Sequence, residues 1–108
     1  MTTTDSEILL KNKVLKILYQ ITDPELMVNI VDLGLIYHLK TDDAASSVTV
    51  YFTLTSVGCP MGEMIERNIQ ESFHSSFPEF TINTHLVWQP GWSPDMMSEV
   101  ARQELSIF

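Results

Sequence analysis

The chain has 108 residues, of which 44% are hydrophobic, and it carries 14 acidic and 6 basic residues for a formal net charge of −8. This length supports one domain with an ordinary apolar core and excludes two domains of usual size. A surface this acidic repels phosphate backbones, so the composition argues against a nucleic-acid partner.

The termini and the cellular compartment can be predicted from features that the sequence lacks. It has no long apolar run and no signal-peptide pattern, so we expect a cytoplasmic protein with no membrane partner. Its single cysteine cannot form an internal disulfide, which fits a reducing compartment. Residues 1–4 are polar and are predicted to be a frayed N-terminus, and residues 5–108 are predicted to form one domain.

The first predicted element is a helix over residues 5–20, because apolar side chains recur there at helical spacing. Pro24 marks its end, since a proline disfavours helical geometry at the residue before it. Residues 23–34 are then predicted to form an ordered loop, which contains the acidic residues Asp23 and Glu25.

Two strands joined by a short polar hairpin connection are predicted next. Residues 35–40 and 48–55 both alternate in polarity, which is typical of half-buried strands. On the first of them, strict alternation places three side chains on one face: Leu35, Tyr37 and Leu39.

The second half of the chain is predicted to add a helix, a strand and a last helix. The second helix begins at Pro60 and buries a stripe of apolar residues: Met61, Ile65, Ile69 and Phe73. Apolar side chains of residues 80–88, Leu86 and Trp88 among them, predict the third strand, and Ser93 before Pro94 predicts the N-cap of the third helix. The order α-β-β-α-β-α indicates an α+β fold, a single two-layer domain with a small mixed sheet and helices packed largely on one face.

Cys59 follows the second predicted strand and directly precedes Pro60. Because proline suits the first helical position, Cys59 is predicted to be the helix N-cap. Unpaired N–H groups and the helix macrodipole favour the thiolate there and lower the pKa of the thiol. A thiolate attacks electrophiles and binds metals. The same position also suits a small buried residue that fills a tight turn.

The rest of the sequence offers Cys59 no clear partner for a metal centre or for catalysis. A complete iron–sulfur cluster usually needs about four ligands, and this chain has one cysteine. His38, His74 and His85 lie in different predicted elements and show no zinc-ligand spacing. A cysteine enzyme needs a base within hydrogen-bond reach of the thiol, and no sequence signature supplies one.

Four segments of the chain are distinctive in sequence. They are Asp23-Pro24-Glu25-Leu26 with Asn29-Ile30-Val31-Asp32-Leu33-Gly34-Leu35-Ile36-Tyr37, Thr53-Leu54-Thr55-Ser56-Val57-Gly58-Cys59-Pro60-Met61-Gly62, Leu86-Val87-Trp88, and Trp92-Ser93-Pro94-Asp95-Met96-Met97-Ser98. Together they resemble the SufT/PaaD-like family of metal–sulfur cluster biosynthesis factors. The resemblance implies an iron–sulfur cluster assembly type of domain that matures iron–sulfur proteins and has no turnover chemistry of its own.

The resemblance also implies which residues form the functional site. The family's motif cysteine corresponds to Cys59, and its acidic loop corresponds to Asp23 and Glu25 with Leu26 beside them. The hydroxyl-bearing strand end of the family corresponds to Thr55 and Ser56. These six residues are the site that the sequence predicts.

Three hypotheses of function follow. In the leading one, the protein assists the assembly or delivery of iron–sulfur clusters, with Cys59 as a transient ligand of a labile cluster. With one thiolate per chain, such a cluster would be shared with a second chain in a homodimer, with the assembly machinery or with an apo client protein. The alternatives are an adaptor of the same pathway that binds no iron, and a cysteine-dependent enzyme.

Overall fold

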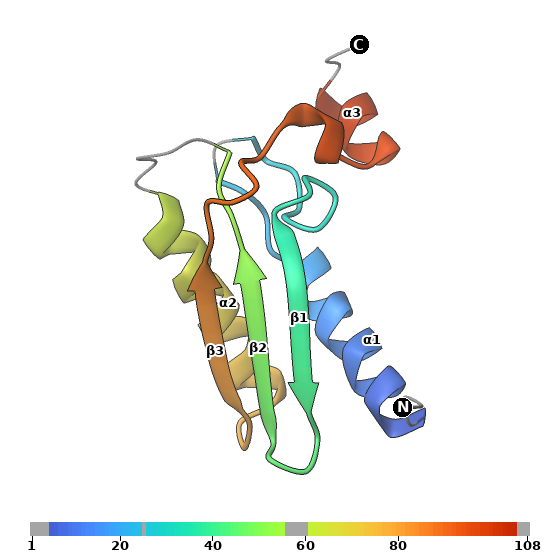
Figure 1. The fold of residues 1–108 in the computed structure, drawn as a ribbon, viewed down its shortest axis with the longest axis vertical. Coiled ribbons are helices and arrows are strands. Elements are labelled where there is room, and N and C mark those ends of the chain that lie inside the picture. The colour runs from blue at the N-terminus through green and yellow to red at the C-terminus, as the bar shows by residue number, and fades with distance from the viewer. Residues whose placement is uncertain (1–4, 25, 56–60, 106–108) are drawn as a thin grey trace.

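The protein is described here by a computed structural model that covers residues 5–24, 26–55 and 61–105. Its elements follow the predicted order α-β-β-α-β-α: α1 (Asp5–Tyr19), β1 (Ile36–Asp42), β2 (Ser47–Phe52), α2 (Met61–Ser76), β3 (Thr81–Leu86) and α3 (Glu99–Leu105). The predicted α+β class is therefore confirmed. α1 and α2 pack along one face of the sheet, and α3 lies beyond its end (Figure 1). No helix in these ranges is long and apolar enough to cross a membrane.

The sheet has three strands in the order β1-β2-β3 and is mixed, as predicted. β1 and β2 form an antiparallel hairpin, whereas β3 runs parallel to β2 because α2 carries the chain back to the start of the sheet. The central strand β2 buries alternate side chains against the helices: Val48, Val50 and Phe52. Its other side chains, Thr49 and Tyr51 among them, lie on the open face.

Both helices bury one apolar stripe against this central strand. Three fully buried side chains of α2 match the predicted stripe: Ile65, Ile69 and Phe73. The α1 stripe comprises Leu10, Val14 and Leu18. Full burial of such side chains contributes about 1.5–3 kcal/mol each, so this layer contact supplies most of the stability of the domain.

The prediction of strict alternation on β1 is wrong at Tyr37. The pairing of β1 with β2 shifts between Ile36 and His38, so Tyr37 is an extra, bulged residue. As a result Ile36 shares the helix-facing side with Leu39. A bulge redirects a side chain, and here the Tyr37 hydroxyl donates to the Pro90 carbonyl oxygen at 2.7 Å.

The third helix begins later than predicted. Pro94–Met96 form only a 3-10 turn, and the Ser93 side chain makes no capping hydrogen bond. Met97 then has extended backbone, which interrupts the helix. Ser98 is the residue that caps α3, because its hydroxyl accepts from the Ala101 N–H at 3.2 Å.

Residues 87–98, called the strap below, cross the loop that precedes β1. The Trp92 indole Nε1–H donates to the Leu33 carbonyl oxygen at 2.7 Å. At the far end of the strap, the Ser98 N–H donates to the Asp32 carbonyl oxygen at 2.7 Å. Trp92 is therefore half-buried, and its indole has a structural role in holding the strap to the loop.

Gly34 makes this crossing sterically feasible. Its φ is +80°, and a Cβ built at this position would lie 2.3 Å from the backbone oxygen of Met96. Glycine is the residue that accepts both the left-handed backbone and the contact.

We expect Gly34→Ala to lower the free energy of unfolding by at least about 2 kcal/mol, since it adds both backbone strain and a backbone collision. Urea denaturation measures this loss. Gly91→Ala is the matched control, because nothing lies within 4 Å of a Cβ there. Equal stability of the two variants would contradict the close approach.

Candidate functional site

Several segments of the chain meet at one end of the sheet, called the site end below. β2 and β3 are parallel, so their C-terminal ends share this edge, and antiparallel β1 begins there. The loop after α1, the first turn of α2 and the strap lie at the same end (Figure 1). Of the predicted site residues, the structure describes Asp23, Leu26 and Thr55, all in these segments. Glu25, Ser56 and Cys59 lie outside the described residues.

Asp23 is buried and holds the turn of the acidic loop. One of its carboxylate oxygens accepts the Leu26 N–H at 2.9 Å, and its backbone carbonyl accepts the Met27 N–H at 2.8 Å. The Asp23 N–H in turn donates to the Val28 carbonyl oxygen at 2.9 Å. This carboxylate thus closes a local turn, a common use of aspartate. Leu26 is half-buried against the core.

The end of β2 carries one buried hydroxyl and one that is half-buried. The Thr53 N–H donates to the Leu35 carbonyl oxygen at 2.8 Å, which ties the residue after β2 to the residue before β1. The Thr53 Oγ1 is buried and has no hydrogen-bond partner among the described residues. Thr55 follows as a half-buried residue at the point where the chain leaves the sheet.

Exposed apolar side chains surround the site end, and we call Met27, Leu86 and Trp88 the apolar rim. Met27 has a left-handed backbone and is 73% exposed. Leu86 and Trp88 were predicted to belong to the apolar face of the third strand. Their side chains are instead 38% and 37% exposed, and β3 ends at Leu86. The sequence does not reveal this rim, because a single apolar residue gives no signal of its exposure.

Two of the three histidines form an aromatic row on the open face of the sheet. The ring centroids of His38 and Tyr51 are 5.6 Å apart, and those of Tyr51 and His85 are 5.0 Å apart. His74 lies in the last turn of α2, at the opposite end of that helix from the site end. Within residues 5–24, 26–55 and 61–105, no three His, Cys, Asp or Glu side chains lie close enough to hold a metal ion.

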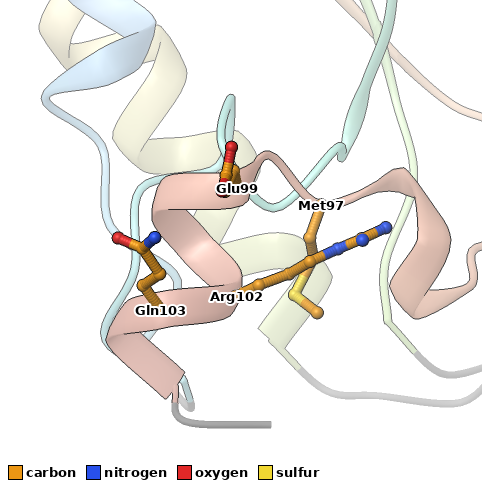
Figure 2. A pocket seen from close by; sticks show the side chains of 4 residues that line it. All are labelled: Met97, Glu99, Arg102 and Gln103. Carbon is orange, nitrogen blue, oxygen red and sulfur yellow. The ribbon is translucent and has the colours of Figure 1, made fainter. Parts of the chain in front are cut away.

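A pocket of about 450 Å³ lies beside α3 and is lined by Met97, Glu99, Arg102 and Gln103. Figure 2 shows the Arg102 side chain extending from α3 past Met97. Its Nη2 donates to the Asp95 carbonyl oxygen at 3.1 Å, so the guanidinium anchors α3 to the preceding turn. None of the predicted site residues that the structure describes lines this pocket.

Comparison with known proteins identifies a family. The family model described as "Iron-sulfur cluster assembly protein" matches residues 11–81. The chain is 39% identical over 100 residues to the "Fe-S protein maturation auxiliary factor YitW" of Bacillus subtilis, covering 91% of this chain and 95% of that protein. It is 41% identical over 88 residues to the "Fe-S protein maturation auxiliary factor SufT" of Staphylococcus aureus, covering 81% and 98%.

A solved structure agrees with the fold described above. The crystal structure of a domain of unknown function, DUF59, from Bacillus anthracis superposes with a TM-score of 0.87 at 36% identity. The match covers 95% of this chain and 97% of that one. The fold and the sequence similarity therefore extend together over nearly the whole domain.

Two substitutions at Asp23 separate its bond to the loop from its charge. We expect Asp23→Ala to lower the free energy of unfolding by about 1–2 kcal/mol, because the Leu26 N–H loses its acceptor. Asp23→Asn keeps an acceptor oxygen and should retain most of the stability. Urea denaturation compares the variants, and equal losses would show that the negative charge, not the turn bond, stabilises the loop.

Thr53→Val tests the buried hydroxyl. Removing a buried polar group that lacks a partner should leave stability unchanged or raise it by about 1 kcal/mol. Thr49→Val, at a half-buried position of β2, is the control and should change little. A loss of more than about 1 kcal/mol in Thr53→Val alone would mean that the hydroxyl has a stabilising partner.

Proposed function

Because the chain belongs to the family of iron–sulfur cluster assembly proteins, we propose that it is an auxiliary factor in the maturation of iron–sulfur proteins. In this function it assists the transfer of clusters from the assembly machinery to apo client proteins. The cluster is its cargo, and the protein carries out no turnover chemistry.

The observation that carries the proposal is the extent of the family match. It spans residues 11–81, and all six predicted site residues fall within that range. The relatives in Bacillus subtilis and Staphylococcus aureus are both named maturation auxiliary factors, which supports the same role for this chain. A factor of this kind must contact other proteins, and the exposed apolar rim supports such contact.

The proposed role of Cys59 is that of a transient cluster ligand. A cluster needs about four ligands, and one chain brings one thiolate. The remaining ligands would come from a second copy of the chain, from a small thiol or from the donor or client. Such incomplete ligation favours rapid transfer over storage, so any bound cluster should pass quickly to an apo protein or a chelator.

A second candidate function is an adaptor that binds the same partners without binding iron. The exposed apolar rim favours it, because such a surface can contact a partner protein without any metal. Anaerobic reconstitution with iron and sulfide separates the two. An absorbance in the wild type that is lost in Cys59→Ser supports the cluster carrier, whereas retained partner binding with no chromophore supports the adaptor.

We expect Cys59→Ser to fold normally and to lose maturation activity. Serine is close to cysteine in size and is a good helix N-cap, so stability should change by no more than about 1 kcal/mol. The measurement is the activity of an iron–sulfur enzyme in cells that carry the variant, at matched protein level. Normal enzyme activity would remove the thiol from the mechanism, and degradation of the variant would assign Cys59 a structural role instead.

A further inference from the structure

The outer edge of β1 is uncovered, in contrast to the other edge of the sheet. On β3, the Gln70 side chain of α2 donates from Nε2 to the Ile82 carbonyl oxygen at 3.1 Å, so α2 covers part of that strand's backbone. Among the described residues, β1 has β2 as its ladder partner and no strand or side chain bonded along its outer side. An open edge presents N–H and C=O groups to any extended chain.

A groove of about 370 Å³ lies beside this edge, between β1 and α1. Apolar side chains from both elements line it, among them Leu15 of α1 and Leu39 of β1. Ile8 and Tyr19 are exposed and lie on the same helical stripe as Leu15, so the apolar surface continues along α1 in both directions. An extended chain on the β1 edge would therefore find an apolar wall at its side.

The charge of this groove is opposite to that of the chain as a whole. Lys11 and His38 line the groove, and none of its described lining residues carries a carboxylate. Lys40 follows on β1, on the same open face of the sheet as His38, and the carboxylate of this strand, Asp42, lies at its end away from the groove. In a chain of net charge −8, this basic stretch is complementary to an acidic ligand.

We propose that β1 binds an extended acidic segment of a partner protein, which joins the sheet as an additional strand. Strand alternation defines its side chains. Those that face the helices meet Leu15 and Leu39 and are apolar, whereas those on the open face lie beside His38 and Lys40 and are acidic. This surface depends neither on Cys59 nor on iron, so it goes beyond the function proposed above.

A second copy of this chain suits the groove less well. A symmetric dimer through β1 would place the same edge on both sides of the contact. The lysines of one copy would then face those of the other, and like charges across a pair of strands are destabilising. An acidic partner segment has no such conflict.

The test uses the full chain and a fluorescein-labelled probe peptide as long as β1, which has 7 residues. The probe alternates Glu and Val, and a control peptide carries Lys in place of every Glu. We expect fluorescence anisotropy to detect binding of the Glu peptide and not of the Lys peptide. Lys40→Glu should weaken binding about fivefold, because Lys40 lies beside the acidic side chains, and Leu15→Asp should weaken it at least about tenfold. Lys16→Glu changes the net charge as Lys40→Glu does but lies outside the groove and outside β1, so affinity should stay within about twofold.

Hydrogen exchange of the backbone amides identifies the binding mode. Bound probe should protect amides of β1 that do not bond β2, and should leave β3 unchanged. Failure to bind at about 1 mM probe, equal affinity for both peptides, or binding without new protection on β1 would each overturn the proposal. Sedimentation that shows a dimer abolished by Leu15→Asp would overturn it in favour of a second copy of the chain.

Discussion

The close approach of the Met96 backbone to Gly34 is the contact on which the site end depends. Any side chain at position 34 would collide with the Met96 carbonyl, so glycine lets the strap cross the loop before β1. Trp92 and Tyr37 then fasten the strap through hydrogen bonds of 2.7 Å each. The strand that leads to the motif cysteine is bonded to both crossing segments, because Thr53 donates to the loop and Phe52 accepts from the strap.

The elements with a strong pattern could be predicted from the sequence, and the details set by tertiary contacts could not. The apolar stripe of α2 is where its spacing placed it, because a buried helix face repeats along the chain. The bulge at Tyr37 could not be predicted from the alternation of apolar and polar residues. The Tyr37 hydroxyl bonds the carbonyl oxygen of Pro90, which is far along the chain. A serine followed by proline predicted a helix N-cap at Ser93, but the N-cap of α3 is Ser98. The backbone N–H of Ser98 donates to the Asp32 carbonyl oxygen, a contact that the sequence does not show.

The same distinction applies to the candidate site. The sequence motifs predicted that the loop containing Asp23 lies near the end of β2, and the loop after α1 does lie at that end of the sheet (Figure 1). That the Asp23 carboxylate closes its own turn required the loop conformation. The exposure of Leu86 also depends on tertiary contacts, because Gly62 of α2 lies near it and a Cβ at Gly62 would be 3.8 Å from the Leu86 side chain.

The strap has a consequence for the order in which the domain assembles. Its bonds to Tyr37 and Leu33 join residues that are 53 and 59 positions apart, whereas the β1–β2 hairpin closes over a short turn. Closing a longer stretch of chain costs more entropy, so the hairpin forms early and the strap docks late. Contacts made last on the way to the native state open first under native conditions. We therefore expect the backbone amides of the strap to exchange with solvent sooner than those of the hairpin.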